Sequence, residues 1–183
     1  MAFAGSVVVM MLSAGLFAMP DPQQPQPGEL QFVRLKPADS EMRRLIVDGH
    51  LRSAEFRSLV DQIQRSNAVV IVQFGDCAKG RFRACVTNVD GDARQRSVRV
   101  KISPRTTEDR LIATIGHELQ HVVEILADVN VTGADSALAL YRRIGEGQCR
   151  AGLSEACETK AALETERRVL QELDRAPRVA RAP

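Results

Sequence analysis

Two histidines one helical turn apart are the feature that most constrains this chain. His117 and His121 stand four residues apart, and Glu118 follows the first of them. On an α-helix, residues four apart lie about 40° apart around the axis and about 6 Å along it, so both imidazoles can face one metal ion. The carboxylate, about 100° further round, can reach a water molecule on that metal. The pattern predicts a metal site with an open coordination position on one helix face.

The sequence around these histidines has the periodicity of an amphipathic helix. Thr106 or Thr107 is suited to cap its N-terminus, and Glu108 and Asp109 place acidic side chains in the first turn, where the helix dipole favours them. Apolar residues then recur at helical spacing, and they are Leu111, Ile112, Ile115, Leu119, Val122, Val123 and Leu126. We therefore expect a helix that buries one face and presents the histidines on another.

The residue types match the chemistry of zinc-dependent hydrolysis. Neutral imidazole is a good zinc donor, and zinc lowers the pKa of a bound water to about 7. Glu118 can take the proton and pass it to a leaving amine. His117, Glu118 and His121 form an HExxH motif, through which the chain resembles the zincin metallopeptidases. The resemblance implies an enzyme that hydrolyses peptide bonds, with Glu118 as the general base acting on the zinc-bound water.

The third zinc ligand has to come from another part of the chain. No histidine follows His121 and the last methionine is Met42, which excludes the longer metzincin pattern. A carboxylate, a water or, less favourably, His50 remains. We predict Glu158, because HExxH followed at a distance by Glu-x-x-Ala resembles the gluzincins, in which that glutamate completes the zinc site. Ala162 stands where that family usually has an aspartate or another polar residue.

Several neighbouring side chains remain alternatives for roles in this site. Glu155 and Glu164 are close enough in sequence to replace Glu158 as a ligand. Glu124 returns to the helix face of His117 but lies about 10 Å along the axis from it, which favours contact with a ligand or an ion pair in the site over direct metal binding, and a solvated position on the helix is the further alternative. Three further residues are candidates for stabilising the oxyanion of a transition state: Tyr141, Arg142 and Arg143.

The N-terminal part of the chain has the composition of an export signal. Residues 1–19 carry no charged side chain, and residues 7–17 form an apolar core of signal-peptide length. We expect an exported protein, periplasmic or secreted, with an uncleaved membrane anchor as the alternative. Residues 20–30 are a Pro/Gln-rich linker, residues 31–175 form a single domain, and residues 176–183 are expected to be a disordered tail.

The four cysteines fall into two pairs, each with seven residues between its members. In an exported chain this spacing favours two local disulfides, Cys77 with Cys85 and Cys149 with Cys157. Four cysteines allow three connectivities, and a structural zinc site on these thiolates is a weaker alternative.

The order of predicted elements indicates an α+β fold. A helical pattern over residues 41–67 breaks near Asp48 and Gly49, with His50 at the break. Strands are predicted over residues 68–74, 83–89 and 97–102, the last two joined through a turn at residues 90–92, and the HExxH helix follows. Helices from Asp135 or Ser136 to Ile144 and over residues 158–175 complete the chain. We expect a small, mostly antiparallel sheet before the HExxH helix, with further helices after it, as in a minimal zincin.

The resemblance also implies where a substrate would bind. In zincins the strand beside the metal helix commonly holds extended substrate by backbone pairing, a role open here to residues 98–102 or 83–89. Ordinary sheet strands without a substrate role are the alternative for both.

The charge balance of the chain bears on the class of partner that it can bind. The formal net charge is +2, and the cationic residues are spread along the chain, so we expect no nucleic-acid partner. A peptide or protein substrate is the expected partner, with membrane contact only if the N-terminal segment is not cleaved. The alternatives are a catalytically inactive zincin-like binding or structural module of the cell envelope, and a zinc hydrolase acting on another bond.

Overall fold

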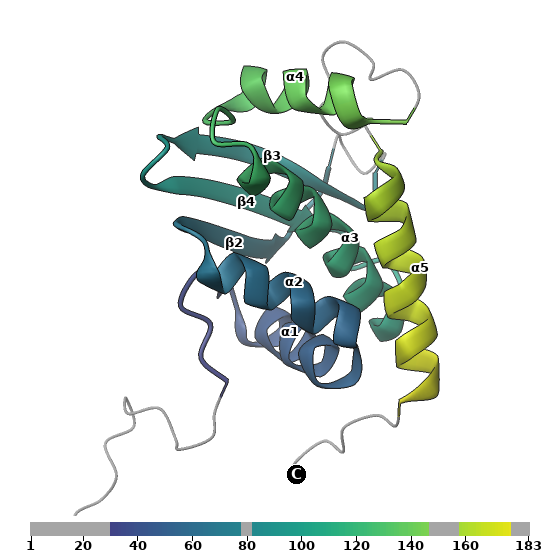
Figure 1. Cartoon of the computed structure of the whole chain (residues 1–183). Coiled ribbons are helices and arrows are strands. Elements are labelled where there is room, and N and C mark those ends of the chain that lie inside the picture. Colours follow the sequence, from purple (N-terminus) through teal and green to yellow (C-terminus); the bar gives the residue numbers. More distant parts are fainter. Residues whose placement is uncertain (1–29, 78–81, 147–157, 177–183) are drawn as a thin grey trace, which may run out of the picture. The chain divides into compact units, whose positions relative to one another are not determined.

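The computed structural model describes residues 30–77, 82–146 and 158–176 (Figure 1). The predicted signal peptide, the linker as far as residue 29, the tail beyond residue 176, the second cysteine pair and Glu155 lie outside the described residues. Within these ranges, no helix has the length and apolar character needed to cross a membrane. The elements in chain order are β1 (Leu35–Pro37), α1 (Ser40–Arg52), α2 (Ala54–Arg65), β2 (Ala68–Phe74), β3 (Ala84–Gly91), β4 (Arg96–Ile102), α3 (Glu108–Ala127), α4 (Ala134–Ile144) and α5 (Lys160–Arg175).

The four strands form one mixed sheet in the order β1-β2-β4-β3. β1 pairs with β2 and β2 pairs with β4 in parallel, whereas β3 and β4 are antiparallel. The α+β class is confirmed, but the expectation of a mostly antiparallel sheet is wrong. Helices α1 and α2 carry the chain from β1 back to the start of β2, which makes that pair parallel. The chain then runs out to the edge as β3 and returns as β4 beside β2.

The helical pattern after β1 is divided at a different place from the predicted one. The break lies at Ser53, whose hydroxyl caps α2 by accepting a hydrogen bond from the Phe56 amide at 3.0 Å. Gly49 lies inside α1, where a Cβ atom would come within 2.7 Å of a methyl group of Ile112 and 3.2 Å of the Phe56 ring. This glycine therefore marks a close helix contact and not a turn. His50 lies in the last turn of α1.

The core lies between one face of the sheet and the helices. Alternate residues of the two central strands are fully buried, and α1, α2 and α3 cover that face (Figure 1). The fully buried apolar residues of these two strands are Ala68, Val70, Val72, Val98, Val100 and Ile102. Helix α5 packs on α3 at Gly116, where a Cβ atom would lie 3.2 Å from a methyl group of Val169. The small residue brings α5 close to the helix that carries the histidines.

β3 is an edge strand and differs from its prediction in detail. Its register with β4 shifts between Val86 and Asn88, so Thr87 forms a bulge. Gly91 at its end has φ of 119°, a left-handed conformation that suits glycine and allows the predicted turn into β4. The predicted disulfide between Cys77 and Cys85 is present and ties the segment after β2 to the start of β3.

Candidate metal centre

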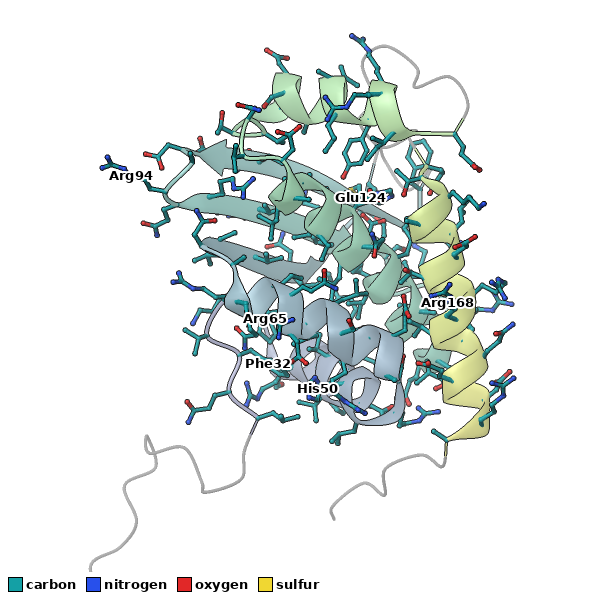
Figure 2. The ribbon with its side chains drawn as sticks, viewed as in Figure 1. Phe32, His50, Arg65, Arg94, Glu124 and Arg168 are labelled. Carbon is teal, nitrogen blue, oxygen red and sulfur yellow. A yellow bond between two sulfur atoms is a disulfide. The ribbon has the colours of Figure 1, made fainter. Side chains whose placement is uncertain are left out.

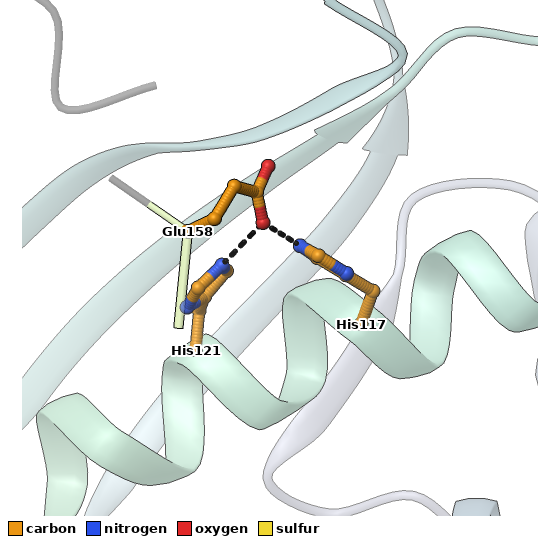
Figure 3. A group of neighbouring side chains, drawn as sticks. All are labelled: His117, His121 and Glu158. Carbon is orange, nitrogen blue, oxygen red and sulfur yellow. Dashed lines mark ion pairs between the residues drawn. The ribbon is translucent and has the colours of Figure 1, made fainter. Parts of the chain in front are cut away.

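The two histidines and Glu158 come together where α3 meets the start of α5 (Figure 3). Oε2 of Glu158 lies 2.9 Å from Nε2 of His117 and 3.9 Å from Nε2 of His121. The candidate ligand atoms of the three residues all lie within 4.8 Å of one another. These three side chains could therefore hold a metal ion.

The donor set fits a transition-metal site with three protein ligands. In a tetrahedral site with bonds of about 2.0 Å, ligand atoms lie about 3.3 Å apart. The two separations from Oε2 of Glu158, 2.9 and 3.9 Å, bracket that value. Two imidazole nitrogens with one carboxylate oxygen leave a fourth position for water or substrate.

Burial and charge are unequal among the three ligands. The side chains of His117 and His121 are 8% and 9% exposed, whereas that of Glu158 is 49% exposed. Burial alone lowers the pKa of His117, but contacts with the Glu158 and Glu166 carboxylates outweigh it and hold the pKa at about 10. His121 is likewise buried, and Glu124 and Glu158 raise its pKa to about 9. The two imidazoles in turn hold the pKa of Glu158 well below its usual range.

Glu118 is buried beside the histidines, and together with them it lines a cavity that is described below. Burial raises the pKa of this carboxyl group, while the neighbouring His121 and His117 oppose the rise. A carboxylate with a raised pKa is better suited to accept a proton near neutral pH than an exposed one.

The second nitrogen of each imidazole faces a carboxylate. Nδ1 of His121 lies 3.0 Å from Oε2 of Glu124, which Figure 2 shows on α3. Nδ1 of His117 lies 3.4 Å from Oε2 of Glu166 on α5, an ion-pair distance without the alignment of a hydrogen bond. Glu166 also contacts Arg83 at 3.1 Å. Both imidazoles thus have Nε2 directed at Glu158 and Nδ1 at another acidic side chain.

Backbone contacts place Glu158 beside the metal helix. Its carbonyl oxygen accepts a hydrogen bond from the Glu146 amide at 2.8 Å, which links it to the end of α4. The next residue, Thr159, caps α5 by accepting from the Ala162 amide at 3.1 Å. Glu158 was predicted to open the last helix, and it lies one residue before that cap. The C-terminal end of α3, the helix that carries the histidines, is held by Arg96. This side chain donates hydrogen bonds to the carbonyl groups of Ile125, Leu126, Asp128 and Val131.

A cavity of about 270 Å³ lies beside the three ligands. One side is formed by residues 82–89, which include most of β3, and the others by α3, α4 and the start of α5. Thr114 lines this cavity one turn before Glu118, and its buried hydroxyl has no hydrogen-bond partner within the described part of the chain. The cavity is large enough to admit a few amino-acid side chains next to Glu118.

The other candidate residues lie in different surroundings. Glu164 faces Lys160 and Arg168 at 3.9 and 4.0 Å, and His50 lies on α1, away from Glu124 in Figure 2. Tyr141 is buried, and its hydroxyl donates to the carbonyl oxygen of His121 at 3.0 Å. Its proton therefore anchors α4 to the metal helix. Arg143 pairs with Asp128, and Arg142 is exposed.

Three residues near the site were not found from the sequence: Glu166, Thr159 and Arg83. Glu166 carried a usable signal, because residues 162 and 166 are four apart and share a face of α5, the helix that follows Glu158. Arg83 and Thr159 reach the site only through the packing of β3 and α5, which no local pattern reveals.

Comparisons with known proteins identify no relative. No known protein family, no curated protein and no solved structure matches the chain.

Proposed function

We propose that this protein is an exported zinc metallopeptidase of minimal, gluzincin-like type. The observation that carries the proposal is the convergence of His117, His121 and Glu158 at one point, with Glu118 buried in the adjoining cavity. An HExxH helix that buried its histidines among apolar side chains would lack both the third ligand and the access.

His117, His121 and Glu158 would hold the metal. When bound there, zinc supplies Lewis acidity and makes water a stronger acid. Glu118 accepts the proton of the attacking water and then transfers it to the leaving amine. The Glu118 carboxylate is only 5% exposed, and its raised pKa favours holding the proton between the two steps.

β3 is the strand we propose for substrate binding. β4, the other strand considered, is paired with β2 on one side and β3 on the other, so its backbone groups are already used. β3 pairs only with β4 among the described strands, and its residues line the cavity. An extended peptide laid along this edge by backbone hydrogen bonds would pass Glu118 and the metal ligands. Peptides and proteins are therefore the proposed substrates.

Export is part of the same proposal. The Cys77–Cys85 disulfide is the supporting observation, because such bonds persist in oxidising compartments. The apolar N-terminal segment supplies the signal, and its uncleaved form would keep the protein on a membrane.

The test is hydrolysis of a mixed-sequence peptide pool by the zinc-loaded full chain, with products identified by mass spectrometry. We expect cleavage that a chelator abolishes and added zinc restores. Glu118→Gln is the control, since it keeps the size of the side chain and removes the base. It should bind zinc as the wild type does and lose about 10²-fold to 10⁴-fold in turnover. A wild type that binds zinc and cleaves nothing would contradict the proposed peptidase activity. The catalytically inactive binding module would then be the remaining hypothesis.

A further inference from the structure

Glu124 contacts both sides of the metal centre with one carboxylate. Its Oε2 lies 3.0 Å from Nδ1 of His121, and its Oε1 accepts a hydrogen bond from the Thr159 hydroxyl at 2.6 Å. The Glu124 side chain is 10% exposed and Thr159 is 3% exposed. Both oxygens of this buried carboxylate therefore have protein partners, which leaves neither one directed at the metal position.

The contact with His121 sets the state of the imidazole. A carboxylate at Nδ1 favours the tautomer with the proton on that nitrogen, because the N–H can then donate to it. Once the ring gives up its second proton to bind a metal, the lone pair is on Nε2, the atom that faces Glu158. Glu124 thus fixes both the ring orientation and the nitrogen that is free to bind a metal.

The contact with Thr159 sets the position of the third ligand. Thr159 uses its hydroxyl twice, as a donor to Glu124 and as the acceptor that caps α5. Glu158 is its immediate neighbour in the chain. Holding Thr159 against α3 therefore holds the backbone of Glu158 near the histidines. The side chain of Glu158 itself remains half exposed.

We infer that Glu124 is a positioning residue that couples the orientation of His121 to the placement of Glu158. The inference rests on the metal site of the proposed function and not on the reaction. Ala162 offers no polar group one turn after Glu158, so the bridge from the metal helix itself, through Glu124 and Thr159, does the work of orienting both ligands. Glu166 makes a longer contact with His117, and its other oxygen contacts Arg83.

The test measures zinc and cobalt dissociation constants of the full chain by competition with a chelator. Glu124→Gln should weaken binding by about 10-fold to 100-fold, because the amide cannot accept from both donors as an anion does. Thr159→Val should weaken it as well, whereas Thr159→Ser keeps the hydroxyl and should restore near wild-type affinity. The double change Glu124→Gln with Thr159→Val should cost little more than either alone if the two residues act through one bridge.

Glu172→Gln is the matched control for a structural effect. Glu172 accepts hydrogen bonds from the Ser53 hydroxyl at 2.5 Å and the Glu55 amide at 3.1 Å, so it too is a carboxylate bound to a helix cap. Its loss should lower the melting temperature of the protein without zinc about as much as the loss of Glu124, and leave metal affinity and the visible spectrum of bound cobalt unchanged.

The outcomes separate this inference from the proposed function. Unchanged metal affinity in Glu124→Gln, with one zinc still bound to the wild type, would overturn the positioning role and leave the proposed function standing. A wild type with no measurable zinc affinity would overturn both.

Discussion

Two buried charged clusters lie along α3, and the cluster around the histidines lines a cavity. Near its start, Arg52 is 4% exposed at the side chain and contacts Asp48 at 2.8 Å, Asp109 at 2.9 Å and the Leu173 carbonyl at 2.9 Å. Further along, His117 and His121 share the carboxylate of Glu158 beside the cavity. Both clusters join α3 to α5, but the arginine is enclosed by protein partners, whereas the histidines present two nitrogens and an acid to an open space.

A structural charge cluster differs from a candidate site in where its polar atoms are directed. Arg52 binds each terminal nitrogen to a protein group, which stabilises the packing of α1, α3 and α5. The Nε2 atoms of the two histidines face one half-exposed side chain, that of Glu158, and a metal ion could bind all three residues. We therefore expect changes at Arg52 to act on stability and changes around the histidines to act on metal binding.

Proton-linked metal binding should show the largest effect. The pKa values of about 10 for His117 and about 9 for His121 mean that both rings are protonated near neutral pH before metal binds. Binding should then release about two protons, so affinity rises by about 100-fold per pH unit between about pH 6 and about pH 8. Calorimetry in buffers of different ionisation enthalpy measures this count. The same raised pKa values stabilise the fold below about pH 6.5, and that contribution is lost as the pH rises through about 9 to 10. Release of fewer than one proton would contradict the charge state.

Removal of the arginine in the enclosed cluster should cost the most stability. Arg52→Ala removes the buried guanidinium that contacts both Asp48 and Asp109, and we expect a loss of about 3 kcal/mol in the free energy of unfolding. Urea denaturation of the protein without metal measures it. Arg168→Ala, at a side chain 53% exposed with a contact to Glu55 at 3.5 Å, is the control and should change it by less than about 0.5 kcal/mol. Comparable losses in the two variants would remove the distinction.

Arg96→Met should have an intermediate effect. The change keeps an apolar stem and removes the donors to the carbonyl groups at the end of α3. Since that helix has no basic residue in its last turn, we expect a loss of about 2 kcal/mol in the free energy of unfolding. Hydrogen exchange of the last turn of α3 should rise with it. An unaltered exchange rate would show that the capping is dispensable.

Glu166→Gln should have the smallest effect. Its contact with His117 is 3.4 Å long and poorly aligned, so the loss in zinc affinity should be less than about 10-fold. Chelator competition beside Glu124→Gln gives the comparison directly. A larger loss at Glu166 than at Glu124 would reverse the order of the two acidic residues.

Local patterns in the sequence were sufficient for some parts of the fold. His117 and His121 share a helix face because four residues make about one turn. The turn at Gly91 is also predictable from local sequence, because the residues that specify it are adjacent in the chain. The boundaries of β2, residues 68–74, agree with the predicted strand.

Other parts depended on contacts between distant segments. The directions of β1 and β2 follow from the path of α1 and α2, which residue patterning does not reveal. Gly49 reads as a helix break in the sequence, yet the space it leaves is filled by Ile112. Glu158 was predicted from a resemblance, and the packing of α5 on Gly116, together with the contact between Thr159 and Glu124, brings it beside the histidines.

The most direct test of the central claim is the zinc content of the purified full chain, measured for the wild type, His117→Ala and Glu158→Ala. We expect about one zinc per chain in the wild type, none in His117→Ala, and binding weakened by about 10-fold or more in Glu158→Ala. No zinc in the wild type, or equal zinc in all three proteins, would contradict a metal centre built from these side chains.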